Sequence, residues 1–186
     1  MKRIYFPVIT ILVGLSQLAF ASTKLVTQDE KSHLEFLAIG RPAMIRIKGE
    51  AKGPHGNVDL NDGKVTGKFT LKLDDLSTGI DMRDRHMKEK YLETQKAPVA
   101  ELSIDNLSLK NLNKVSDVPF EGTLNLHNVS KKVSGIVSME TEGSNKQVDA
   151  NFKLHLSDFG ISIPSYAGLT VADEVQVTLK IELKPE

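Results

Sequence analysis

The sequence Lys-Val-Thr-Gly-Lys-Phe-Thr-Leu-Lys-Leu-Asp occupies residues 64–74, and its apolar residues and glycine alternate without exception with Lys, Thr and Asp. A period of two over this length predicts a β-strand with one buried and one wet face. The stretch continues to Met87, and after a turn signal at Ser77-Thr78-Gly79 it concentrates charge in residues 81–86. We therefore expect a long strand that delivers a polar cluster to one end of a sheet.

The same period of two recurs along the chain, with turn residues between the segments and no helix-period segment of comparable length. The eight segments are Ser32–Ala38, Ala43–Lys52, Lys64–Asp74, Val99–Leu107, Val118–His127, Lys132–Thr141, Gln147–Leu156 and Glu174–Leu183. Antiparallel strands with one apolar face either pack as two sheets or curl into one closed sheet. The pattern thus predicts an all-β, eight-stranded antiparallel fold, as a barrel or a sandwich.

Two features favour the barrel. Gly67, Gly122 and Gly135 stand on the apolar faces of otherwise regular strands, where glycine weakens the ladder unless it permits sharp bending. The connections at residues 61–63 and 142–145 are short, as in up-and-down hairpins. Because glycine can equally mark a bulge, the sandwich remains the alternative.

One short helix is expected after the charged cluster. Asp81 can serve as its N-cap, Lys88 falls in a later turn where it complements the helix dipole, and Met87 and Tyr91 share a face at i, i+4. Pro98 prevents the helix from continuing. Such a helix would cover one open end of a barrel.

Residues 1–21 have the pattern of a signal peptide, with Lys2 and Arg3 before an apolar run and Ala19-Phe20-Ala21 as the cleavage site. We expect cleavage after Ala21, a single domain at 22–186, and a periplasmic or secreted protein; an uncleaved membrane anchor is the alternative. The chain has no cysteine, so the exported fold needs a real core.

The chain contains 24 basic and 24 acidic residues, and loss of residues 1–21, with Lys2 and Arg3, leaves a net charge of about −2. This balance gives no electrostatic reason to expect nucleic acid or an anionic membrane surface as a partner. The sequence leaves open whether two barrels associate as a homodimer.

The residues that could carry chemistry lack the spacing that chemistry needs. The five histidines show no His-x-His or His-x-x-x-His pair, so neither a metal nor another cofactor is expected. His127 and His155 fall on polar strand faces and are expected to be solvated. Asp84 and His86 are two residues apart, which on a helix separates them. An enzyme acting at the Asp84/His86 end is therefore the weaker hypothesis, and we expect no catalytic residue.

The interior of an eight-stranded barrel is either just filled by side chains or just large enough for one ligand. The inward faces here are aliphatic, with Phe36, Phe69, Phe120 and Phe152 as large rings. The segment Gly160–Asp173 is unusually apolar for a loop and either covers a binding mouth or forms an extra strand. A solid-cored exported protein that binds a protein partner through this loop is the alternative function.

Four motifs across residues 32–175 together resemble one family, the YceI family. They are Ser32-x-x-x-Phe36; Arg83-Asp84-x-His86-Met87; Leu124-x-Leu126-His127-Asn128-Val129-Ser130-Lys131-x-Val133; and Ser157-Asp158-Phe159-Gly160-Ile161 with Ala172-Asp173-Glu174-Val175. The resemblance implies a lipocalin-like barrel that binds a polyisoprenoid, such as a quinone tail or a polyprenyl lipid, and performs no catalysis.

Under this resemblance the expected site has an apolar lining and a polar end. The expected lining is Phe36, Phe69, Leu71, Leu102, Phe120, Leu124, Phe152 and Leu154, and the expected polar end is Arg83, Asp84, His86 and Asp158. Arg83 and Asp158 could instead pair to hold the helix. The family's usual histidine and arginine are replaced by Ile39-Gly40 and Leu156. Their loss favours an apolar or quinone ligand over a charged pyrophosphate.

Overall fold

The computed structural model describes residues 22–42, 45–109, 111–166 and 168–186. The expected signal peptide lies outside the described residues, as does Ala43, the first residue of one expected strand. The described strands are β1 (Thr23–Thr27), β2 (His33–Arg41), β3 (Ile45–Lys52), β4 (His55–Asn61), β5 (Lys64–Lys72), β6 (Val99–Ser108), β7 (Lys114–Leu126), β8 (Val129–Glu142), β9 (Asn145–His155), β10 (Ser165–Tyr166) and β11 (Leu169–Pro185).

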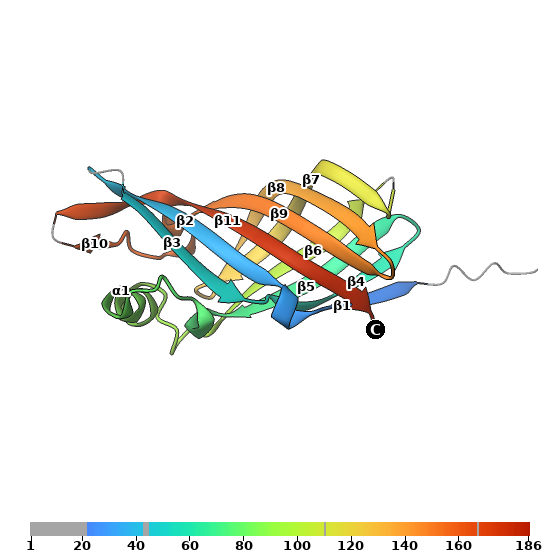
Figure 1. The fold of residues 1–186 in the computed structure, drawn as a ribbon. Helices are drawn as coiled ribbons and strands as arrows, with labels where there is room; N and C mark the ends of the chain where they lie inside the picture. The colour runs from blue at the N-terminus through green and yellow to red at the C-terminus, as the bar shows by residue number, and fades with distance from the viewer. Residues whose placement is uncertain (1–21, 43–44, 110, 167) are drawn as a thin grey trace, which may run out of the picture.

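The strands close into an antiparallel barrel (Figure 1). Neighbours follow the order β1-β4-β5-β6-β7-β8-β9-β11, and β1 pairs back onto β11 to complete a ring of eight. The barrel predicted from the strand pattern is therefore confirmed, and the sandwich is wrong. Each strand turns its apolar face inward, as in β11, where Val175, Val177, Leu179, Ile181 and Leu183 are all buried.

Two positions in the barrel wall are each built from two strands. β2 and β1 lie end to end along the same edge of β11, separated by the 3₁₀ turn η1 (Asp29–Lys31). β3 and β4 likewise lie end to end, with Gly53 and Pro54 between them. The sequence pattern predicted β2 and β3 but not β1 and β4. β4 was missed because His55, Gly56, Asn57 and Asn61 are typical of turns.

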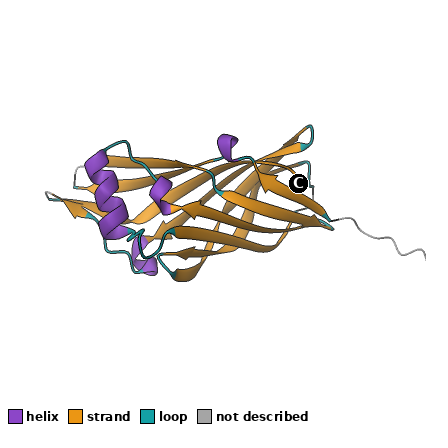
Figure 2. Cartoon of the chain, turned by 90° about the horizontal axis from the view of Figure 1, so that it is seen from below, coloured by secondary structure: helices purple, strands orange, loops and turns teal. Residues whose placement is uncertain are grey.

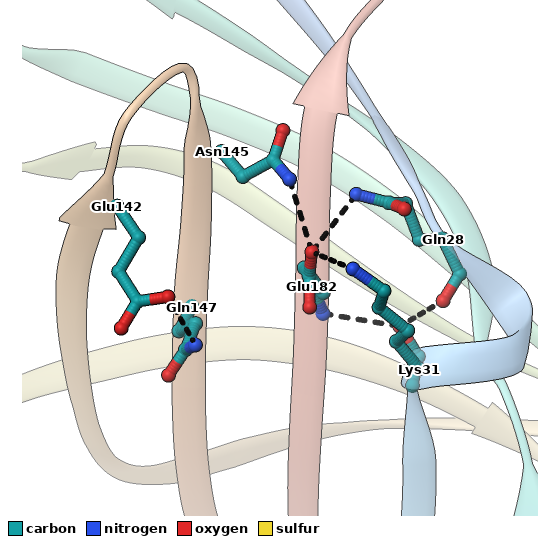
Figure 3. Close-up of polar contacts among 7 residues, drawn as sticks. Gln28, Lys31, Glu142, Asn145, Gln147 and Glu182 are labelled. Atoms are coloured by element: carbon teal, nitrogen blue, oxygen red, sulfur yellow. Dashed lines mark hydrogen bonds and ion pairs between the residues drawn. The ribbon is translucent and has the colours of Figure 1, made fainter.

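The corner between β1 and β2 is fixed by a polar cluster (Figure 3). The buried Ser32 hydroxyl donates to the carbonyl oxygen of Gln28 at 2.8 Å and accepts from the amide of Glu182 at 3.1 Å. One carboxylate oxygen of Glu182 accepts from Gln28, Lys31 and Asn145 at 2.9 to 3.0 Å. The hydrogen bond from Lys31 is the main reason that the pKa of Glu182 lies below its ordinary value. This first family motif is thus a structural corner.

At the other end of the barrel β3 forms the edge of the sheet. The β3 residues before Glu50 pair only with β2, and Glu50 pairs with Ser77, which follows the turn η2 (Leu73–Asp75). The helix α1 (Asp81–His86) and its π-helical continuation η3 (Met87–Tyr91) lie at this end (Figures 1 and 2). The expected end-covering helix is confirmed. Asp81 is not its N-cap, however, because Asp81 is the first residue of the helix and Ile80 is the N-cap.

Within the described part of the chain, no helix is long and apolar enough to span a bilayer.

Candidate functional site

A cavity of about 520 Å³ opens at the end of the barrel that carries α1. Its wall comes from the inner faces of β2, β3, β5, β6, β7, β9 and β11, from one side of the helical segment, and from the turns around Leu73, Leu156 and Pro164. Apart from Thr78, Arg83, His86, Tyr91 and Ser165, every residue of the wall is apolar. Ligand pockets typically have volumes of about 300 to 1,000 Å³ and mostly apolar walls with few polar groups. The barrel is therefore hollow at this end.

A second cavity of about 80 Å³ lies toward the end of the barrel formed by β1 and β4 and shares no lining residue with the first. The structure divides the expected lining between the two. The large cavity is lined by Phe36, Leu71, Leu124, Phe152 and Leu154, and the small one by Phe69, Leu102 and Phe120. The small cavity is below the usual size of a ligand pocket.

Two aromatic rings stand between the cavities. Phe152 lines the large cavity and Phe120 the small one, and their rings meet edge to face. Gly135 makes room for this contact, because a Cβ there would lie 2.8 Å from Cβ of Phe152 and 2.9 Å from Cε1 of Phe120. The phenylalanines, which the sequence marked as lining, thus also divide the interior.

Arg83 and Asp84, at the start of α1, both bind the segment that precedes the helix. Arg83 donates to Thr78 through Nε to Oγ1 at 2.7 Å and through Nη2 to the carbonyl oxygen at 2.9 Å. Asp84 accepts from the Ser77 hydroxyl at 2.8 Å, from the Thr78 amide at 2.7 Å and from the Thr78 hydroxyl. Burial opposes ionisation of Asp84, but the hydrogen bonds from Thr78 and Ser77 outweigh it and lower the pKa of this carboxyl.

The four residues of the expected polar end therefore separate. Arg83 and His86 line the large cavity, whereas Asp84 faces the Ser77-Thr78 segment and lines neither described cavity. Asp158 is exposed and also lies outside both walls. The described hydrogen bonds of Arg83 go to Thr78 rather than to Asp158.

Sequence reasoning missed two polar residues of the wall, Thr78 and Ser165, and assigned Tyr91 only to a helix face. The Tyr91 hydroxyl lies 3.3 Å from the amide nitrogen and 3.4 Å from the carbonyl oxygen of Ser165, so it joins the helical segment to the Gly160–Asp173 loop. The apolar residues Ile161 and Pro164 of that loop line the cavity, and β10 pairs with the start of β11. The unusual apolar character of this loop was the signal that pointed to a mouth.

His127 corrects one expectation, because it is not solvated. Its Nδ1 lies 3.1 Å from the carbonyl oxygen of Phe159, its Nε2 lies 3.1 Å from Oε2 of Glu93, and its side chain is only 18% exposed. Side-chain hydrogen bonds lower the pKa of Glu93, and the bond from Lys96 contributes more than the bond from His127. The period-two pattern placed His127 on a wet face but could not show that η4 (Leu156–Phe159) and the segment after η3 cover it.

The comparisons with known proteins agree on one fold. The sequence profile of the YceI-like domain matches residues 25–183. A polyisoprenoid binding domain from Saccharophagus degradans superposes with a TM-score of 0.68 at 14% identity, covering 87% of this chain and 98% of its own. BcnA from Burkholderia cenocepacia gives 0.70 at 16% identity, with 84% and 98% covered. The Campylobacter jejuni YCEI protein gives 0.59 at 18% identity, with 75% and 85% covered. A search of curated proteins finds no match.

Proposed function

From the premise that this chain belongs to the YceI-like domain family, we propose that it is an exported, non-enzymatic carrier of a polyisoprenoid or a similar long-chain amphiphile. The observation that carries this proposal is the apolar cavity of about 520 Å³ inside the barrel. A solid core would need no such space, and close packing normally leaves few voids larger than a water molecule.

The cavity supplies the affinity for the ligand through burial of the ligand's hydrocarbon chain. Each methylene group moved from water into an apolar wall contributes about 0.8 kcal/mol, so several isoprene units outweigh the loss of translational freedom and the ordering of the chain. A rigid barrel wall limits the further ordering cost, because the strands are already fixed by their ladders. The isoprenoid chain lies along the barrel axis, with its end toward Phe120 and Phe152.

The head group lies at the open end, near Arg83 and His86. Arg83 is already bound twice to Thr78, and Leu156, where the family usually has arginine, adds an apolar surface to the wall. Few polar groups thus face the opening, which fits a neutral head group such as a quinone better than a pyrophosphate. The expected signal peptide supports a periplasmic or secreted location for the same role.

The test is organic extraction of the mature protein, purified without detergent, with mass spectrometry of the extract. A single stoichiometric isoprenoid supports the proposal and identifies head group and chain length together. The emptied protein is then titrated with a quinone and with a polyprenyl alcohol. This second measurement detects binding even where the expression host does not make the natural ligand. A folded, monodisperse protein that carries no lipid and binds neither probe would contradict the proposal.

A further inference from the structure

The opening of the large cavity is surrounded by apolar side chains that face water. Among the described residues, five large apolar side chains are exposed, and three of them, Ile45, Ile80 and Met82, line the large cavity at 47%, 53% and 52% exposure. The other two, Val99 and Ile136, line neither described cavity. Clustered exposed apolar side chains mark interaction sites, whereas single ones are ordinary.

These three side chains flank the place where the sheet has an edge. Ile45 begins β3, whose residues before Glu50 pair only with β2, and Ile80 and Met82 stand at the start of α1. We call Ile45, Ile80 and Met82 the portal rim. Because all three also line the cavity, they connect the apolar interior with the outer surface.

The charge around the portal rim differs from that of the rest of the chain. Segments 41–48 and 80–91 contain seven Lys and Arg and three Asp and Glu, which leaves 15 basic and 21 acidic residues elsewhere in 22–186. Of the three acids, Asp84 is already bound by Ser77 and Thr78. Exposed Arg46, Lys48 and Arg85 stand beside the rim in sequence. The near-neutral total charge thus conceals two basic segments beside the portal rim.

We propose that the portal rim docks onto the surface of an anionic lipid bilayer and that the ligand passes between bilayer and cavity through this opening. The rim side chains enter the boundary between head groups and acyl chains, and the surrounding Lys and Arg lie at the lipid phosphates, as in other interfacial anchors. This inference rests on the proposed carrier function for its purpose, although the docking itself does not require a bound ligand.

The chemistry of the ligand favours a bilayer over a protein partner. A long isoprenoid that crosses water exposes its whole apolar surface, which is the cost that the cavity removes. A rim that touches the bilayer replaces this step with a path whose walls are mostly apolar. A bilayer of either charge would offer such a path, but the basic surroundings of the rim select an anionic one.

The experiment is co-sedimentation of the mature protein with lipid vesicles. One set contains phosphatidylcholine alone, and the other contains phosphatidylcholine and phosphatidylglycerol in equal parts. We expect sedimentation with the anionic vesicles, a several-fold weaker effect with the neutral ones, and loss of binding as salt rises. Equal binding to both vesicle types, or binding to neither, overturns the proposal.

Matched variants test the surface itself. Met82→Asp and Arg46→Glu should each reduce sedimentation several-fold, whereas Ile136→Asp and Lys132→Glu, which change exposed residues of β8, should leave it unchanged. All four positions are exposed, so thermal unfolding should remain close to that of the parent protein. If Met82→Asp behaves like Ile136→Asp, the rim is not the docking surface and the proposal fails.

Lipid extraction of the same variants separates this inference from the carrier function. Loss of vesicle binding with the ligand still present supports docking by the rim as a property separate from ligand retention. Vesicle binding by a protein that holds no ligand and takes up neither isoprenoid probe supports docking while the carrier function fails. Retained ligand without any vesicle binding by the parent protein overturns docking alone.

Discussion

The rings of Phe120 and Phe152 meet edge to face, with their centroids 6.3 Å apart and their planes at 86°. This geometry is favourable for aromatic pairs and contributes about 0.5 to 1.5 kcal/mol beyond area burial. Since Phe152 lines the large cavity and Phe120 the small one, the pair stands where a growing ligand chain would stop. We therefore expect this contact to set the depth to which the chain of a ligand can enter.

Removal of one ring of the Phe120–Phe152 pair should allow the protein to bind a longer ligand. Phe152→Ala joins the two cavities, so the longest isoprenoid that still gains affinity should increase, at a cost of about 3 to 5 kcal/mol in the free energy of unfolding. Dissociation constants for isoprenoid alcohols of increasing length measure the effect. Leu126→Ala also enlarges the large cavity but leaves the rings in place, so an equal shift in that variant would contradict the partition.

Filling the large cavity should weaken binding without weakening the fold. Ala38 is buried and lines this cavity, and Ala38→Leu displaces about two methylene groups of the ligand, which costs about 1.6 kcal/mol or about 15-fold in affinity. Ala150→Leu is the matched change in the small cavity and should leave the affinity for short chains unchanged. Calorimetric titration of both variants decides between them, and equal losses would place the ligand elsewhere.

Gly135→Ala should destabilise the barrel. Its Cβ would lie 2.1 Å from the carbonyl oxygen of Asn151 on the neighbouring strand, which cannot move as a side chain can. Such overpacking lowers the free energy of unfolding by about 1 to 3 kcal/mol, which chemical denaturation measures. In Gly67→Ala the nearest atom is a ring carbon of Phe69 at 3.1 Å, so a smaller loss is expected. Equal losses would show that the backbone contact does not matter.

Asp84 should make the stability of the protein depend on pH. Because its pKa is lower folded than unfolded, it stabilises the fold above its ordinary pKa, and this contribution is lost as the pH falls through the lowered value. Asp84→Asn should cost about 1 to 2 kcal/mol at neutral pH and progressively less in acid. Urea unfolding across this pH range measures the difference.

Asp81→Asn is the control, because Asp81 is exposed at the first turn of the same helix. A difference between Asp84→Asn and the parent protein that stays constant with pH would contradict the role of the ionised carboxylate.

The sequence by itself determined the all-β class, the strands that alternate cleanly and the helix at one end, because side-chain alternation depends only on neighbouring residues. It also marked five residues of the large cavity's wall and three of the small one's, since an inward apolar face lines whatever interior exists. It could not show that β1 and β4 complete the ring, because the short β1 has one buried residue, Leu25, and β4 is rich in turn residues.

Only the tertiary structure decided how the interior is divided and what the motif residues do. Free volume is the space that packed side chains leave over, so neither the cavity nor the Phe120–Phe152 partition follows from any single strand. Ser32, Asp84 and His127 stand in the motifs that suggested the family, and each holds segments together through bonds to residues outside its own strand or helix. The basic surroundings of the portal rim arise for the same reason, because folding brings two segments distant in sequence to one opening.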